Sequence, residues 1–221
     1  MIRMHYPIDF EAYKNSFDEK VNLRKKVRDK YEISEDAIVL SVVGKLVPWK
    51  NQDHIIKAMK LLEEDSVFLN LFVIGSGDMR EEWEQKADKL KKSKVHFTGF
   101  VNIDELPMYY AATDIYVHPA SLEPHSVAIS EAIIMGCPVI LSDRCGSYGE
   151  TDDVQIGKNG YVYEFGNIKD LAEKIKMLSR NKIKRHSFGK YSHELGMQFQ
   201  RNSHVVFLEK LISHYMSDTN Q

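Results

Sequence analysis

The chain has 221 residues, of which 43% are hydrophobic and 28% charged, and its formal net charge is −2. This composition is that of a globular protein with a buried core, and the lack of a basic excess argues against a nucleic-acid partner. No stretch approaches the roughly 18 apolar residues that a membrane span needs, and the first residues lack the apolar centre of a signal peptide. We therefore expect a cytoplasmic protein, with peripheral contact to the inner face of a membrane left open.

Strands and helices are predicted to alternate after a polar segment of about 35 residues that contains one basic helix, over 21–31. The predicted strands cover 37–43, 67–74, 95–98, 115–117, 138–141 and 161–163. The predicted helices cover 51–62, 80–91, 104–112, 126–135 and 168–179, followed by a longer amphipathic helix over 191–216. Such alternation is typical of an α/β fold, a Rossmann-like three-layer sandwich built on a parallel sheet. We divide the chain into a lead-in segment (1–35), one Rossmann-like domain (36–180) and a helical tail (181–221).

The loop after the first strand carries two lysines. Lys45 and Lys50 lie five positions apart in the segment that leads into the next helix. Parallel sheets bind ligands at the carboxyl ends of their strands, and two ammonium groups at such a place suit a diphosphate. Two solvated surface lysines are the alternative.

The loop after the second strand contains Gly75 and Gly77. Glycines at this position let the backbone approach a phosphate closely, although a tight turn without a ligand is an equal alternative. The third glycine of the dinucleotide fingerprint is replaced by Arg80, and no acidic residue ends the next strand. The sequence therefore argues against a nicotinamide cofactor.

The segment from the fourth strand into the next helix carries two carboxylates. Glu131 is the only charged residue of an apolar, buried helix, and a buried carboxylate is costly unless several donors satisfy it. Ribose hydroxyls are suitable donors, and a pairing with a lysine or arginine is the alternative. Glu123 lies in the loop just ahead of the helix, and an exposed loop acid without a ligand is the alternative. The first amides of the helix, near Ser126 and Val127, are an expected anion site.

No metal site is predicted. His118 and His125 flank Glu123, but no third ligand follows at zinc spacing, and the chain has no pair of aspartates separated by one residue that would hold a divalent cation. The two histidines are interpreted as loop contacts. Phe100, after the third strand, is interpreted as a neighbour of a nucleotide base or, equally, as a core aromatic.

Several collinear segments resemble motifs of one enzyme family, the group 1 (family 4) retaining glycosyltransferases of the GT-B architecture, over roughly residues 37–180. Glu123 and Glu131, separated by seven residues, resemble the glutamate pair of that family, and Ser121–Ser126 and Glu131–Ile140 resemble the surrounding sequence. Further matching segments are Val43–Lys50, Ile74–Gly77, Phe97–Val101 and Gly157–Val162.

This resemblance implies that the chain is the C-terminal, nucleotide-sugar-binding half of a GT-B enzyme. Such an enzyme transfers a sugar from a UDP- or GDP-linked donor to an acceptor hydroxyl with retention, without a metal or other cofactor. Glu123 is then the catalytic-site residue that contacts the sugar, and Glu131 binds the ribose. The remaining substrate-binding residues implied by the resemblance are Lys45 and Lys50 at the diphosphate, Phe100 and Val101 at the base, and Gly77, His125, Ser126 and Val127 around the phosphate and sugar.

Three departures from the family pattern bear on these expectations. Lys45 replaces the usual arginine, and His125-Ser126 replaces an aromatic-glycine pair, so donor preference or loop shape can differ. The segment His5–Phe10 resembles the junction that precedes the second domain, so we expect the acceptor-binding half, for a glycan or lipid-linked sugar, to lie outside this chain, which alone is then inactive. The terminal helix resembles one that packs toward that half. The alternative is a noncatalytic nucleotide-binding module, or one subunit of a two-chain enzyme.

Overall fold

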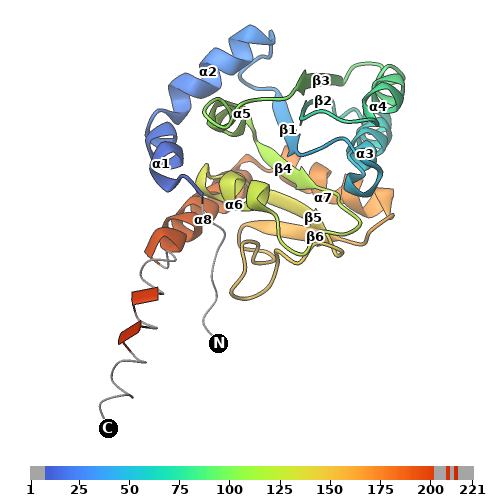
Figure 1. Cartoon of the computed structure of the whole chain (residues 1–221). Helices are drawn as coiled ribbons and strands as arrows, with labels where there is room; N and C mark the ends of the chain where they lie inside the picture. The colour runs from blue at the N-terminus through green and yellow to red at the C-terminus, as the bar shows by residue number, and fades with distance from the viewer. Residues whose placement is uncertain (1–7, 202–207, 210–211, 214–221) are drawn as a thin grey trace.

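The computed structural model describes residues 8–201, 208–209 and 212–213, and in this part of the chain a six-stranded parallel sheet is flanked by helices on both faces (Figure 1). The strand order is β3-β2-β1-β4-β5-β6, and every neighbouring pair is parallel. The strands are β1 (Ile38–Val43), β2 (Leu69–Ile74), β3 (Lys94–Gly99), β4 (Ile115–His118), β5 (Val139–Ser142) and β6 (Gly160–Tyr163). The predicted Rossmann-like α/β fold is confirmed.

The helices divide between the two faces of the sheet because alternate residues of each strand point to opposite sides. One core cluster combines Val39 and Tyr116 with helices α1 (Phe10–Asp18), α2 (Lys20–Lys30), α5 (Leu106–Ala112) and α6 (Val127–Ile134). The other combines Leu40 and Val117 with α3 (Asp53–Glu64), α4 (Arg80–Ala87) and α7 (Ile168–Arg180). Helix α8 (Lys182–Arg201) packs against both α6 and α7. A short 3₁₀ helix, η1 (Pro48–Lys50), precedes α3.

Three helices differ from the prediction by four or more residues. Helix α4 ends at Ala87, four residues before the predicted end at 91. Helix α1 was not predicted, although Asp9 accepts a hydrogen bond from the Ala12 amide at its N-terminus and Tyr13 is buried on its inner side. Helix α8 begins at Lys182, nine residues before the predicted start at 191. The predicted end, at Met216, and the segment 5–7 of the proposed junction lie outside the described residues. The division into three domains stays a prediction.

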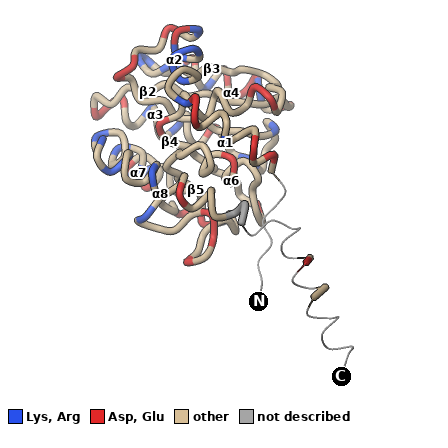
Figure 2. Tube along the Cα trace, turned by 90° about the vertical axis from the view of Figure 1, so that its left-hand side faces the viewer, with Lys and Arg blue, Asp and Glu red and all other residues tan. Residues whose placement is uncertain are grey.

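Charges of both signs are interspersed along the described chain, as Figure 2 shows. Within that part no helix is both long and apolar enough to cross a membrane. The same residues contain no group of three or more His, Cys, Asp or Glu side chains placed to hold a metal ion.

Glu63, near the end of α3, fixes the loop that leads into β3. Its two carboxylate oxygens accept hydrogen bonds from the amides of Lys91, Lys92 and Ser93 at 2.6–2.8 Å. Partial burial raises the pKa of Glu63, but these amides outweigh it and lower the pKa to about 2. The stabilisation is therefore complete above the unfolded-state pKa of 4.5 and is lost as the pH falls toward 2.

We expect Glu63→Gln to lower the free energy of unfolding at pH 7 by about 1–2 kcal/mol, because a neutral amide offers one acceptor where a carboxylate offers two. The variant should also show a weaker loss of stability between pH 4.5 and 2 than the unmodified protein. Urea unfolding at several pH values measures both effects. Glu64→Gln, at the exposed neighbouring position, is the control; equal behaviour of the two variants would contradict the assignment.

Candidate functional site

The strand order reverses direction between β1 and β4, which run side by side in the middle of the sheet. In open α/β sheets ligands bind outside the carboxyl ends of the strands at such a reversal point. The loop 44–52 follows β1 and the loop 119–126 follows β4, and the Ser121 amide donates to the Trp49 carbonyl at 2.8 Å to join them. These are the two loops that carry the predicted lysines and Glu123.

The glycine loop after β2 packs against the lysine loop. The Leu46 amide donates to the Ser76 carbonyl at 2.9 Å, and the Met79 amide donates to the Leu46 carbonyl at 3.0 Å. At Gly77, where φ is +157°, a Cβ atom would lie 2.3 Å from the Leu46 carbonyl oxygen. Contact between the loops is thus a sufficient reason for glycine at position 77, and its role at a phosphate stays a prediction.

Lys50 and Glu123 meet across the two central loops. The Lys50 ammonium donates a hydrogen bond to Oε2 of Glu123, and both side chains are largely shielded, with 21% and 16% of their surface exposed. Lys45 is exposed, and its backbone carbonyl accepts a hydrogen bond from Gln52. The structure therefore distinguishes the two predicted lysines: Lys50 is held at Glu123, whereas Lys45 extends into solvent.

A buried histidine completes the environment of Glu123. His118 Nε2 lies 3.4 Å from Oε2 of Glu123, and His118 Nδ1 lies 3.3 Å from the Tyr116 hydroxyl. Burial alone would raise the pKa of Glu123, but His118 and Lys50 together lower it to about 2. Glu123 is therefore a carboxylate at neutral pH, whereas burial lowers the pKa of His118 and favours the neutral imidazole.

Glu131 is the second buried carboxylate, with only 6% of its surface exposed. The Tyr110 hydroxyl donates to its Oε2 at 2.9 Å, and none of the described lysines or arginines pairs with it, so its partner differs from the predicted alternative. Burial raises the pKa of Glu131, and the Tyr110 and Tyr13 side chains partly offset that effect. The pKa of Tyr116 is raised by burial and then by both Glu131 and Glu123. The two carboxylates thus act on the same buried tyrosine, Tyr116.

The start of α6 is occupied by contacts within the protein. The Ser126 amide donates to the Ser147 hydroxyl at 3.0 Å, and His125 Nε2 lies 3.4 Å from a carboxylate oxygen of Asp153. Ser126 is buried, whereas Val127 is 36% exposed. An anion at this helix N-terminus would therefore meet the Val127 amide more readily than that of Ser126.

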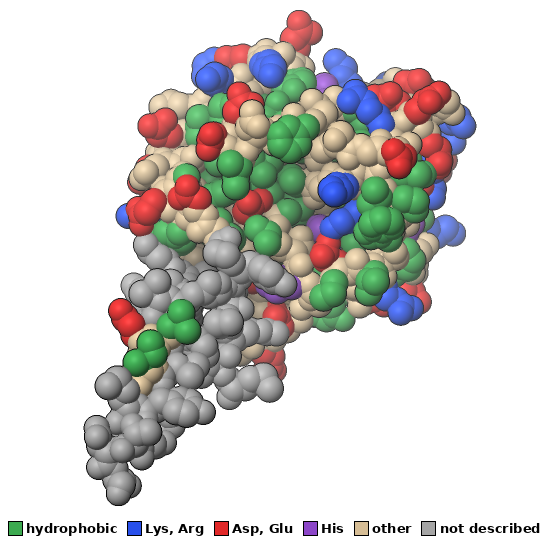
Figure 3. Space-filling view, in the orientation of Figure 1, with side chains coloured by type: hydrophobic (Ala, Val, Ile, Leu, Met, Phe, Trp, Pro, Cys, Tyr) green, Lys and Arg blue, Asp and Glu red, His purple; other side chains and the backbone are tan. Residues whose placement is uncertain are grey.

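Phe100 follows β3 and is 76% exposed. The interpretation as a core aromatic is therefore wrong, while the adjacent Val101 packs against the core. Trp49 and Leu122 are also exposed large apolar residues of the loops at this edge. Figure 3 shows apolar side chains beside basic, acidic and histidine side chains to the right of its centre. Such a mixed surface suits a ligand with both flat apolar and anionic parts.

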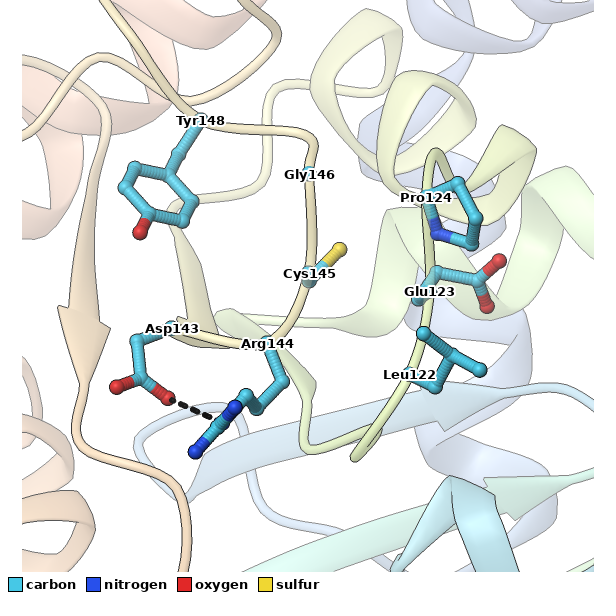
Figure 4. Close-up of a pocket in the computed structure, with 8 residues that line it drawn as sticks. All are labelled: Leu122, Glu123, Pro124, Asp143, Arg144, Cys145, Gly146 and Tyr148. Atoms are coloured by element: carbon cyan, nitrogen blue, oxygen red, sulfur yellow. Dashed lines mark ion pairs between the residues drawn. The ribbon is translucent and has the colours of Figure 1, made fainter.

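Glu123 also lines a cleft of about 480 Å³ between the loops that follow β4 and β5. Figure 4 shows residues 122–124 on one side of the cleft and 143–146 on the other, with Tyr148 farther along. The Glu123 amide donates to the Arg144 carbonyl, and the Gly146 amide donates to the Glu123 carbonyl at 2.8 Å. Asp143, Arg144 and Tyr148, which line this cleft, are not among the predicted site residues. The loop 143–146 directly follows the buried strand β5, and this position is the signal by which the sequence could have indicated these residues.

Comparison with known proteins agrees with this architecture. The sequence profile described as "Glycosyl transferases group 1" matches residues 24–195. The chain belongs to this family. A matching relative, an uncharacterized glycosyltransferase of Methanocaldococcus jannaschii, is 36% identical over 133 residues, which are 59% of this chain and 33% of the relative. Spore coat protein SA of Bacillus subtilis is 29% identical over 195 residues, 84% of this chain and 51% of that protein.

Solved structures of other proteins share the fold. HepE of Anabaena, crystallised in complex with UDP and glucose, superposes with a TM-score of 0.78 at 22% identity, over 97% of this chain and 56% of HepE. The C-terminal domain of the glycosyltransferase LpcC from Francisella tularensis gives a TM-score of 0.64 at 23% identity, over 73% of this chain and 85% of that domain. These likenesses identify half of a GT-B fold. The chain spans a third to about half of the length of the two curated relatives.

Proposed function

We propose that this chain is the nucleotide-sugar-binding half of a retaining, metal-independent group 1 glycosyltransferase, and that a further acceptor-binding half is needed for activity. The observation that carries the proposal is the pairing of Lys50 with Glu123 at the point where the strand order reverses. A cation there can receive a diphosphate, and a carboxylate beside it can accept hydrogen bonds from sugar hydroxyls. HepE, whose fold is similar, was crystallised with UDP and glucose, which supports a nucleotide-sugar ligand.

Each proposed contact uses a group whose place in the structure is known. Lys50 and Lys45 hold the diphosphate of a UDP- or GDP-linked sugar, and Gly77 lies beside it. Glu123 accepts from the sugar and Glu131 accepts from the ribose. The amides of Ser126 and Val127, with His125 before them, meet the phosphate or sugar. Phe100 and Val101 lie beside the base.

The proposed chemistry is transfer of a hexose to an acceptor hydroxyl with retention. As the bond from the anomeric carbon to the diphosphate breaks, negative charge develops on the departing oxygen. Cationic groups placed at that position beforehand stabilise the charge, which is the role we assign to Lys50 and Lys45. The acceptor is a glycan or a lipid-linked sugar, and a lipid-linked acceptor would bring the enzyme to the inner face of a membrane.

Calorimetric titration with UDP, GDP and ADP and their sugar conjugates, in the absence of metal, tests the proposal. One nucleoside diphosphate should bind, and Glu131→Ala and Lys50→Ala should each weaken it. If none binds to the folded protein, the donor site is disproved. If a nucleotide binds but transfer fails even when an acceptor half is supplied, the chain is a noncatalytic nucleotide-binding module instead.

We expect Phe100→Ala to weaken binding of the favoured nucleotide roughly fivefold to tenfold, because an aromatic face stacked on a base contributes about 1–1.5 kcal/mol. Its exposure predicts little change in the melting temperature. Fluorescence or calorimetric titration measures the affinity. Phe68→Ala, which removes another exposed phenylalanine, ahead of β2, is the matched control. Equal affinities of the two variants would place the base elsewhere.

A further inference from the structure

His118, the last residue of β4, has no role in the function proposed above. Only 1% of its surface is exposed. Its ring lies between the Tyr116 hydroxyl, 3.3 Å from Nδ1, and the Glu123 carboxylate, 3.4 Å from Nε2. A buried polar ring held between two polar partners has few alternative orientations, so it can fix the position of what it touches.

The partners of Tyr116 favour one protonation pattern for this ring. The backbone of Val43 lowers the pKa of the Tyr116 hydroxyl, as an amide donor does, and the hydroxyl can donate its own proton to Nδ1 of His118, 3.3 Å away. Neutral imidazole carries one ring proton. With Nδ1 as acceptor, that proton lies on Nε2, which faces Glu123. The arrangement therefore directs toward Oε2 of Glu123, 3.4 Å away, an N–H group that makes no hydrogen bond of good geometry while Lys50 occupies that oxygen.

His118 and Lys50 both approach the same oxygen of Glu123, Oε2. Among the described residues no hydrogen bond or ion pair engages Oε1, the other oxygen, and Figure 4 shows the Glu123 carboxylate pointing away from the loop 143–146. A carboxylate held by one oxygen presents the other in a fixed direction. Lys50 has a flexible stem and is the group that we assign to the diphosphate, whereas the ring of His118 is enclosed by the core.

We propose that His118 is a positioning residue that holds Oε2 of Glu123, so that Oε1 is presented to a hydroxyl of the bound sugar. The inference rests on the proposed function, because it assigns the sugar to Glu123. When the diphosphate draws the Lys50 ammonium toward itself, His118 is the partner that stays with the carboxylate. The predicted consequence is specific: His118 affects recognition of the sugar and not of the nucleotide.

The test compares affinities for a nucleoside diphosphate and its sugar conjugate, using UDP with UDP-glucose and GDP with GDP-mannose, by calorimetry on the full chain. The quantity of interest is the ratio of the two affinities. We expect His118→Leu to lower the conjugate affinity relative to the diphosphate roughly tenfold, which corresponds to one hydrogen bond to a charged group, while the diphosphate affinity itself stays unchanged. His118→Gln should restore most of the ratio, because its amide nitrogen can reach the position of Nε2.

His54→Leu is the matched control, because His54 is also buried and its Nδ1 lies 3.2 Å from a tyrosine hydroxyl, that of Tyr163. It should lower the melting temperature without changing the ratio. If His118→Leu does not fold, Tyr116→Phe frees the ring without emptying the core and should lower the ratio in the same direction.

Two outcomes overturn the inference while leaving the proposed function intact. One is a ratio that His118→Leu, or Tyr116→Phe in its place, does not change. The other is an equal loss of affinity for the diphosphate and its conjugate, which would indicate a general structural role. Failure of the unmodified protein to bind any of the four compounds would instead overturn the proposed function and the inference with it.

Discussion

Replacing Lys50 by alanine is expected to lower the affinity for the favoured nucleoside diphosphate roughly tenfold to a hundredfold. A hydrogen bond to a charged group contributes about 1.5–3 kcal/mol, and each 1.4 kcal/mol is a factor of ten. The ammonium of Lys50 is largely shielded from solvent, so the interaction is less screened than at an exposed site. Lys45, which is exposed, should contribute less. Calorimetric titration of both variants measures the difference.

Replacing Glu123 distinguishes the ion pair that Lys50 makes with Glu123 from the contact that we propose between Lys50 and the diphosphate. In Glu123→Gln the ammonium loses its ion-pair partner and remains available for the diphosphate, so nucleotide affinity should be maintained or increased while the contribution of the sugar falls. The control for Lys50→Ala is Lys60→Ala, which also removes one positive charge, at an exposed position of α3. A folded Lys50→Ala protein with unchanged nucleotide affinity would contradict the proposed site.

The four inner strands, β2, β1, β4 and β5, were predictable because each is a short run of mostly apolar residues between turn signals, a pattern fixed by burial on both faces of the sheet. The edge strands β3 and β6 are less buried. Helix α1 was missed because its sequence is largely polar and Tyr13 is the residue that it buries. Its Phe17 packs against distant parts of the chain, including His193 of α8, with ring centroids 3.4 Å apart. The early start of α8 was missed for a related reason. Its basic first turn looks solvent-exposed, but Arg185 donates to the Leu178 and Ser179 carbonyls at the end of α7.

The candidate site also depends on contacts between distant segments, which the sequence pattern did not predict. Spacing along the chain placed Glu123 ahead of α6 and Glu131 within it, since both belong to one continuous segment. It did not provide their partners, because Tyr110 and His118 belong to other elements and Lys50 comes from a loop 73 residues away. Contacts of this kind are set by tertiary packing. Residue types at regular spacing therefore identified the carboxylates but not the network that sets their charge.

Replacing Asp114 by alanine is expected to have the largest effect on stability. Its carboxylate accepts hydrogen bonds from Arg24 at 3.0 Å, from Arg28 at 2.7 Å and from the Val39 amide at 2.8 Å. Arg28 is completely buried, and its Nη1 donates to the carbonyls of Ser34, Glu35 and Ala37. Removing one partner of such a pair leaves an uncompensated buried charge, which costs about 3–5 kcal/mol.

For a chain of this size that loss corresponds to a fall in melting temperature of roughly 6–20 °C. Asp29→Ala, which removes the partner of Lys25 in an exposed ion pair, should lower the melting temperature far less. The same result bears on how the chain is organised, because Arg24 and Arg28 belong to α2, ahead of the first strand, whereas Asp114 lies directly before β4. If Asp114→Ala melts in one cooperative transition at the lower temperature, α2 is part of the same folding unit as the sheet. Loss of α2 alone, with the sheet still melting at its original temperature, would instead show that the lead-in segment is a separate attachment.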